Sequence, residues 1–178
     1  MKIPSLLSIL IFTSAIVISG CGPSVPELAL YLAIEQNDVA AVQAHMDAGT
    51  DPDKEFMPAG AEFPGAYALH QAIMRDNKTI AKILLDNDAD INITSKDQAG
   101  GTPLHWATFW RKLDMVQFLL DARPDVNYTD SNNHSALDIA QADNPLIDET
   151  DQASIDLRAK IEDMLKRRGG IRGKAKGH

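Results

Sequence analysis

LHQAIMRDNKTIAKILLDNDADIN, residues 69–92, and LHWATFWRKLDMVQFLLDARPDVN, residues 104–127, are two versions of one pattern. Aligned at an offset of 35 residues, they share a leucine, a histidine, an alanine, paired leucines, an aspartate and an asparagine. A further copy begins at Ser135, and a more divergent one covers LYLAIEQNDVAAVQAHMDAGTDPD, residues 30–53. Self-similarity at such a period is typical of a stacked repeat architecture, and it accounts for most of the chain.

Each copy predicts two short helices with one apolar side. In the third copy Leu104 and Ala107 share a side of the first helix, and Met115, Val116, Leu119 and Leu120 line the second. Neither helix can bury such a stripe alone, so stacked copies are expected to form one elongated core, with the divergent first and fourth copies as caps. A small residue recurs at one position of every copy: Ala33, Ala72, Ala107 and Ala140.

The period and the residues resemble the ankyrin repeat, whose most recognisable signature is carried by Gly101-Thr102-Pro103-Leu104-His105. The resemblance implies an all-α solenoid of about four helix-turn-helix repeats, with short hairpin-like turns and divergent capping repeats, over residues 27–170. It also implies structural roles in the turn network for Thr102, Pro103, His70 and His105. In the fourth copy a loop, residues 143–151, precedes a second helix expected at 153–168, which Gly169 and Gly170 should end.

The single cysteine, Cys21, follows an apolar segment that has no charge between Ile3 and Pro26. This is the layout of a secretory signal peptide, and its dense part, residues 6–18, is shorter than the ~20 residues of a spanning helix. Ile18-Ser19-Gly20-Cys21 resembles the cleavage box of bacterial lipoproteins. The resemblance implies a signal peptide at 1–20, a lipid (palmitate) on Cys21 and a tether at 21–26. The alternative is an uncleaved helix whose cysteine only packs.

Localisation follows from the same resemblance. The residue after Cys21 is Gly22 and not the aspartate that is associated with inner-membrane retention in enterobacterial lipoproteins. We therefore expect a lipid-anchored protein of the bacterial cell envelope that faces the periplasm, in the outer rather than the inner membrane.

Charge is divided unevenly along the chain. Residues 22–165 hold 25 acidic and 10 basic residues, a net charge of −15, whereas residues 166–178 hold six basic residues and no acid. An acidic body binds nucleic acid phosphates poorly, so no nucleic acid partner is expected. The basic tail, residues 171–178, is expected to be disordered; the alternative is contact with anionic lipid headgroups.

No arrangement of residues indicates catalysis, a cofactor or a metal. The chain has no GxSxG motif, no phosphate-cradling glycine loop and no His-Cys pairing. His45, His134 and His178 lack the spacing of a metal site. Asp86, Asp88 and Asp90 faintly resemble a calcium loop but lack its glycine and its closing glutamate. We expect no enzyme.

Aromatic residues mark the candidate binding surface. Trp106, Phe109 and Trp110 stand at i, i+3 and i+4, on one face of a helix. The resemblance places these positions in a concave groove that varies with the partner. It assigns partner contacts also to Glu35, Gln36, Gln71, Met74 and Arg75, to Ile139, Ala142 and Asp143 in the fourth copy, and to Thr129, Ser131, Asn132 and His134 at a hairpin tip. The alternative is that the aromatic side chains only pack.

Two connections are longer than the repeat requires. Residues 54–67, KEFMPAGAEFPGAY, contain the apolar residues Phe56, Met57, Phe63 and Tyr67, and residues 95–101 exceed the usual length by two. Loops often carry function in a repeat protein. The first of these loops either folds back over the cap or offers a contact surface.

The function expected from the sequence is a non-catalytic binding module, a monomer when unbound, that captures a protein partner near a membrane. Bacterial ankyrin lipoproteins are similar to immunity proteins that neutralise antibacterial effectors, phospholipases among them, which suggests a secreted toxin as the partner. The alternative is a scaffold or accessory protein that supports an envelope complex or a periplasmic enzyme. A hydrolase with an ankyrin appendage has no room in a chain whose repeats occupy about residues 26–170.

Overall fold

The computed structural model describes residues 24–147 and 150–173, and this part of the chain is helical without a β-strand. The predictions for the signal peptide, Cys21 and residues 174–178 lie outside the described residues. Four helix pairs follow one another along the chain, as predicted. They are α1 (Leu30–Glu35) with α2 (Val39–Asp47), α3 (Ala68–Met74) with α4 (Lys78–Asp86), α5 (Pro103–Phe109) with α6 (Leu113–Asp121), and α7 (Ala136–Gln141) with α8 (Gln152–Arg167).

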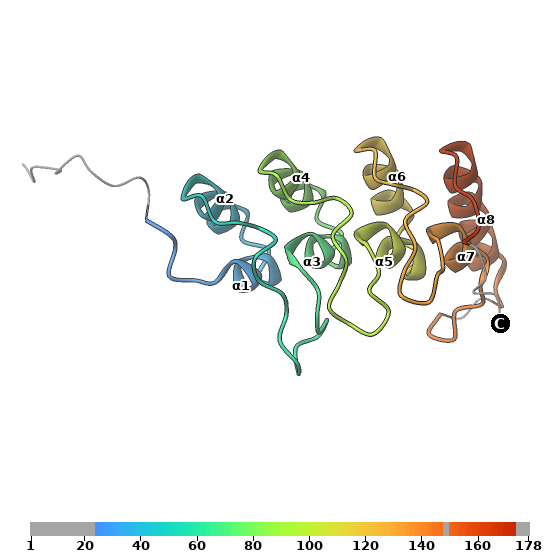
Figure 1. Ribbon diagram of the computed structural model, residues 1–178, viewed down its shortest axis with the longest axis horizontal. Coiled ribbons are helices and arrows are strands. Elements are labelled where there is room, and N and C mark those ends of the chain that lie inside the picture. Colours follow the sequence, from blue (N-terminus) through green and yellow to red (C-terminus); the bar gives the residue numbers. More distant parts are fainter. Residues whose placement is uncertain (1–23, 148–149, 174–178) are drawn as a thin grey trace, which may run out of the picture.

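The pairs stack side by side into an elongated solenoid of two rows (Figure 1). The odd-numbered helices form one row, in which α3 contacts α1 and α5, and α5 contacts α7. The even-numbered helices form the second row, where α2 contacts α4 and α6 contacts α8. The loops between consecutive pairs project on the side of the odd-numbered helices (Figure 1). The all-α repeat fold predicted from the sequence is confirmed.

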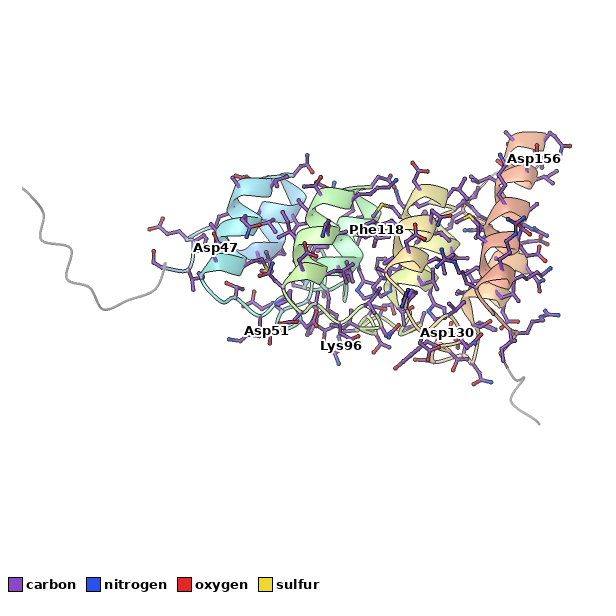
Figure 2. All side chains as sticks on the ribbon, turned by 90° about the horizontal axis from the view of Figure 1, so that it is seen from above. Asp47, Asp51, Lys96, Phe118, Asp130 and Asp156 are labelled. Atoms are coloured by element: carbon purple, nitrogen blue, oxygen red, sulfur yellow. The ribbon has the colours of Figure 1, made fainter. Side chains whose placement is uncertain are left out.

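The core runs through all four repeats, from Leu30 in α1 to Leu165 in α8. Figure 2 shows from above how the side chains follow the four repeats along the long axis. The largest fully buried side chains of the core are aliphatic ones such as Ile34, Ile73 and Leu104. The recurring alanines, Ala33, Ala72, Ala107 and Ala140, are all completely buried. A small side chain at this position allows neighbouring odd-numbered helices to approach, which explains its recurrence.

Short polar residues set the helix starts. Asp38 and Asn77 accept hydrogen bonds from Ala41 N and Ile80 N at 2.9 Å each, so they cap α2 and α4. Thr102 precedes α5, and Pro103 fills the first helical position, where a missing N–H costs nothing. These caps are local features, and they explain why the repeat boundaries can be recognised in the sequence.

The long loop at 54–67 folds back on the solenoid. Phe56 and Tyr67 face each other across an antiparallel bridge with their ring centres 5.8 Å apart, and Met57 is buried between the loop's two sides. Gly65 accepts a hydrogen bond from Lys96 N at 2.8 Å, in the next connection. Gly65 has a φ of +82°, and a Cβ there would lie 2.6 Å from Asp97 N, so glycine is required. The loop therefore packs, although Phe56 stays half exposed.

At the other end, the segment after α8 also packs, which the sequence analysis did not predict. Gly169 ends α8 with a φ of +82°. Ile171 N then donates to Asn127 Oδ1 at 2.8 Å, and Gly173 N donates to Asp138 Oδ2 at 2.6 Å. Residues 171–173, expected to begin a disordered tail, are instead held against the solenoid by Asn127, in the connection after α6, and by Asp138 in α7.

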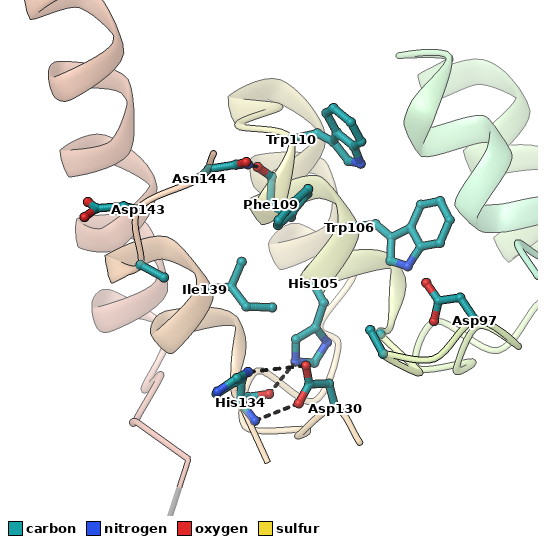
Figure 3. Close-up of a pocket in the computed structure, with 13 residues that line it drawn as sticks. Asp97, His105, Trp106, Phe109, Trp110, Asp130, His134, Ile139, Asp143 and Asn144 are labelled. Atoms are coloured by element: carbon teal, nitrogen blue, oxygen red, sulfur yellow. Dashed lines mark hydrogen bonds and ion pairs between the residues drawn. The ribbon is translucent and has the colours of Figure 1, made fainter. Parts of the chain in front are cut away.

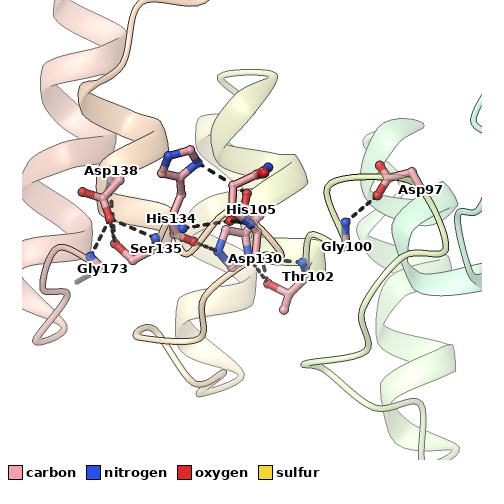
Figure 4. A network of polar contacts seen from close by, with 10 residues as sticks. Asp97, Gly100, Thr102, His105, Asp130, His134, Ser135, Asp138 and Gly173 are labelled. Carbon is pink, nitrogen blue, oxygen red and sulfur yellow. Dashed lines mark hydrogen bonds and ion pairs between the residues drawn. The ribbon is translucent and has the colours of Figure 1, made fainter. Parts of the chain in front are cut away.

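This packing explains why the fourth copy has an aspartate in place of the repeated histidine. His70 and His105 each place Nε2 on a carbonyl oxygen of the next connection, Gly101 O at 3.0 Å and His134 O at 3.1 Å. After the fourth repeat, the described chain continues with residues 168–173, which offer N–H groups to Asp138 instead. Asp138 accepts them from Gly173 and from the Arg172 guanidinium (Figure 4). Residues 171–173 thus stand where a further turn would lie.

Candidate functional site

The turn histidines are structural groups. Thr102 N donates to His105 Nδ1 at 3.1 Å, while His105 Nε2 bonds His134 O in the following connection (Figure 4). A ring nitrogen that accepts from an N–H and another that faces a carbonyl oxygen fix the neutral tautomer with its proton on Nε2. Each histidine therefore connects a capped helix to the next repeat.

Burial keeps these rings uncharged. His70 is completely buried, and desolvation lowers its pKa to about 4, against the smaller opposing effect of the Gly101 carbonyl. The pKa of His105 is lowered for the same reason. Rings that stay neutral, have both nitrogens engaged and lie out of solvent are poor candidates for proton transfer. Their role is to hold the connections in place.

A pocket of about 360 Å³ opens between the third and fourth repeats (Figure 3). Its walls come from α5 and α7, from the connections that precede these two helices, and from the start of the loop that follows α7. Most of its lining is apolar or aromatic, with three carboxylates among the polar groups, which is the character of a binding pocket. The lining residues are Asp97, Ala99, Gly101, His105, Trp106, Phe109, Trp110, Asp130, His134, Ile139, Ala142, Asp143 and Asn144.

The three predicted aromatic residues all line this pocket, but they differ in their surroundings. Trp106 is held on one side, with its ring centre 5.1 Å from that of His70 and 6.2 Å from that of Phe63 in the long loop. Phe109 and Trp110 form an edge-to-face pair at 5.3 Å, and all three aromatic residues are partly exposed. Trp106 therefore both packs on the second repeat and lines the pocket, whereas Phe109 and Trp110 contact each other.

Two candidate residues of the first two repeats, Glu35 and Arg75, lie together beside residues of the long loop. Arg75 bonds Glu62 at 2.6 Å, lies 3.9 Å from Glu35, and faces the ring of Phe63 at 6.0 Å. Met74 is partly buried and Gln36 is exposed. Gln71 is only 3% exposed, which differs from the expected partner contact: the side chain has almost no surface to offer.

The hairpin tip between the third and fourth repeats is a rigid turn. Thr129 and Ser135 form an antiparallel bridge across it. Asp130 Oδ1 accepts from Asn132 N at 2.9 Å and from His134 N at 2.8 Å. Ser131 N also donates to Ala99 O at 2.8 Å, in the preceding connection. The side chains of Ser131, Asn132 and His134 are exposed at this tip, as a partner contact requires.

Several residues that shape the pocket were missed in the sequence. Asn144 is buried, and its Nδ2 donates to Phe109 O at 2.6 Å. Arg111 is buried too, and its guanidinium donates to Ile139 O at 3.3 Å and Ala142 O at 3.0 Å. Both hold the end of α7 near α5, and nothing in the repeat pattern marks them. Asp97 could have been found, because an aspartate three residues before a glycine favours a side-chain-capped turn.

The described residues lack the groups that a metal site or a membrane span would need. Among residues 24–147 and 150–173, no three histidine, cysteine or acidic side chains are grouped so that they could hold a metal ion. None of the helices in this part of the chain is long and apolar enough to cross a membrane.

Comparison with known families agrees with this geometry. The profile for ankyrin repeats, three copies, matches residues 29–142. The chain therefore belongs to the ankyrin-repeat family, whose members generally act as non-enzymatic scaffolds for protein-protein interaction.

Individual relatives share the repeats over part of their length. A putative ankyrin repeat protein of fowlpox virus is 45% identical over 33% of this chain and 30% of its own length. A palmitoyltransferase of Lachancea kluyveri is 28% identical over 65% of this chain and 15% of its own. Because the chain spans less than a third of either, what the whole proteins do does not carry over.

A solved structure supports the fold alone. The ankyrin repeat domain of Bcl-3, a member of the IkappaB protein family, superposes with a TM-score of 0.59 at 23% identity. The match covers 86% of this chain and 61% of that one.

Proposed function

We propose that this chain is a non-catalytic receptor whose concave groove, at the pocket between the third and fourth repeats, binds a protein partner close to a bacterial membrane. The observation that carries the proposal is the partly exposed pair of Phe109 and Trp110 beside an apolar pocket of about 360 Å³. Aromatic side chains in such settings are the residue types enriched at binding hot spots. A rigid hairpin tip beside them presents further polar contacts.

The membrane tether is part of the proposal. The lipoprotein-like box that ends at Cys21 supports an acylated cysteine, and two or three acyl chains anchor a protein stably. The five residues 22–26 span at most ~17 Å, so the groove would work near the periplasmic surface. Cells fed labelled palmitate should label the parent chain, and a Cys21→Ser variant should lose the label completely. Equal labelling of both would remove the tether from the proposal.

Within this proposal, the partner we favour is an antibacterial effector, which the chain would neutralise as an immunity protein. The net charge of −15 over residues 22–165 supports it, because an acidic inhibitor meets a basic, lipid-seeking toxin quickly by electrostatic steering. A scaffold that holds an envelope enzyme would use the same groove. The identity and activity of the bound protein distinguish the two.

The test uses residues 22–178 as bait in an envelope extract, next to a Phe109→Ala/Trp110→Ala double variant. Trp106 is left intact because it packs on His70 and Phe63. The matched control is Tyr128→Ala, an exposed aromatic outside the pocket. We expect the parent and the control to retain one protein that the double variant binds at least about tenfold more weakly.

The activity of the retained protein then distinguishes the immunity function from the scaffold function. If its export to the periplasm kills cells and co-production of this chain rescues them, the immunity function stands. If it is a harmless envelope component, the scaffold function replaces it. Retention that is equal for all three baits would show that the groove is not the binding surface.

A further inference from the structure

Arg75, at the end of α3, lies beside an aromatic ring and two carboxylates of the same chain. The Arg75 guanidinium lies over the Phe63 ring at 6.0 Å and bonds Glu62 at 2.6 Å. A second carboxylate, that of Glu35, lies 3.9 Å away. A planar cation gains both from the face of an aromatic ring and from carboxylate oxygens. In the first two repeats the arginine, the aromatic ring and the carboxylates therefore interact with one another within the chain.

The pocket of the third and fourth repeats offers the same kinds of group without such a cation. Trp106, Phe109 and Trp110 supply aromatic surface, and Asp97, Asp130 and Asp143 supply carboxylates, yet none of the described lining residues is a lysine or an arginine. The carboxylates lie around the aromatic side chains, with Asp97 beside Trp106 at one end and Asp143 at the other (Figure 3).

The three carboxylates are not equivalent. The Asp130 side chain is 6% exposed, and its Oδ1 holds the hairpin tip together. Asp143 is almost fully exposed and pairs with Arg158 at 3.0 Å. Asp97 is exposed, and the hydrogen bonds that it accepts from Ser95 Oγ at 2.8 Å and Gly100 N at 2.7 Å both end on Oδ1. Its Oδ2 is the acceptor best placed for a ligand.

The nearby cations do not neutralise this end of the pocket. Arg111 is buried and donates to the carbonyl oxygens of Thr108, Ile139 and Ala142. Arg158 is engaged with Asp143. His134, the exposed histidine of the lining, has its Nδ1 3.6 Å from Asp130 Oδ2. None of these three groups pairs with Asp97, whose carboxylate lies beside the indole of Trp106 (Figure 3).

We propose that this pocket receives an arginine side chain of the protein partner. The guanidinium bonds Asp97 and stacks on the Trp106 indole, and the aliphatic part of the side chain lies against Phe109 and Ile139. Arginine fits better than lysine because its flat, weakly hydrated head stacks on a ring and bonds a carboxylate at the same time. This inference rests on the proposed function, because it names what the groove recognises.

The test selects random linear peptides on residues 22–178 and measures the affinity of the best binders by calorimetry. Asp97→Asn is the informative variant, because the asparagine Oδ1 can still accept from Ser95 and Gly100 while the charge is lost. Asp86→Asn is the matched control, since Asp86 is an exposed helix residue outside the lining. We expect one invariant arginine in the binders, about tenfold weaker affinity for Asp97→Asn, and no change for Asp86→Asn.

The outcomes separate this inference from the proposed function. Binders that are lost with Phe109→Ala/Trp110→Ala but show no arginine preference and tolerate Asp97→Asn would overturn the arginine pocket and keep the groove. Binders that depend on apolar side chains alone would assign the pocket to an apolar anchor and overturn the inference in the same way. Binders unaffected by the aromatic variant, or no selected binders at all, would contradict both.

Discussion

An Ala107→Leu variant should lose about 3 kcal/mol of unfolding free energy, the largest effect that we expect from a single added side chain. Ala107 is completely buried in α5, the helix that contacts α3 on one side and α7 on the other. Three more carbons there have no space, so the odd-numbered helices must move apart. Because a repeat core is continuous, the displacement weakens the interfaces of both neighbouring repeats. Urea unfolding followed by far-ultraviolet circular dichroism measures the loss.

The matched control is the same substitution at Ala153, which is exposed in the first turn of α8. Leucine and alanine have similar helix propensities, so Ala153→Leu should change stability by less than about 0.5 kcal/mol. Comparable losses in both variants would show that the recurring alanine is not required for close packing of the helices. That result would remove the reason given for its recurrence in all four copies.

The repeat fold could be predicted because its determinants are local and recur. The leucine, alanine and histidine of each copy mark the same positions in each helix pair, and Thr102-Pro103 marks a helix start. The second helix of the fourth copy, after the loop at 143–151, was expected at 153–168 and is found at Gln152–Arg167. A pattern that recurs in several copies predicts structure well, because each copy independently indicates the same helix positions.

The pocket could be predicted only in part. Trp106, Phe109 and Trp110 were found because they occupy three known positions on one face of the repeat's first helix. Asn144 and Arg111 act through side-chain hydrogen bonds that join different repeats, Asn144 with Phe109 O and Arg111 with Ile139 O and Ala142 O. Contacts of this kind depend on how two connections meet in space. Periodicity carries no information about them.

The same distinction explains the C-terminal end of the solenoid. Residues 171–173 look like the start of a basic tail when only composition is considered. Their packing follows from Asp138, which stands at the position that histidine occupies in the two preceding copies. A departure from the repeat was thus the available signal. An aspartate acceptor in place of a histidine donor predicts that the segment after the fourth repeat supplies N–H groups to the aspartate.

Stability should fall by about 3 kcal/mol between pH 6.5 and pH 4 through His70 alone. In the unfolded chain this ring takes up a proton near its ordinary pKa of 6.5, whereas burial lowers the folded pKa to about 4. Within that window the unfolded state binds more protons, so the stabilisation is complete above pH 6.5 and is lost as the pH falls toward 4. Each pKa unit corresponds to about 1.4 kcal/mol. The lowered pKa of His105 adds an effect of the same sign.

The measurement is a series of urea unfolding curves from pH 7.5 to pH 4.5 for the parent and a His70→Gln variant. The variant should be less stable at pH 7.5, because Nε2–H no longer bonds Gly101 O, yet its stability should depend less on pH. Asp53 acts in the opposite direction, since burial raises its pKa, but it is present in both proteins and cancels in their difference. Parallel curves over the whole range would mean that His70 gains its proton as readily in the folded chain as in the unfolded one. A neutral His70 ring, hydrogen-bonded through both nitrogens and joining the second repeat to the third, would then be ruled out.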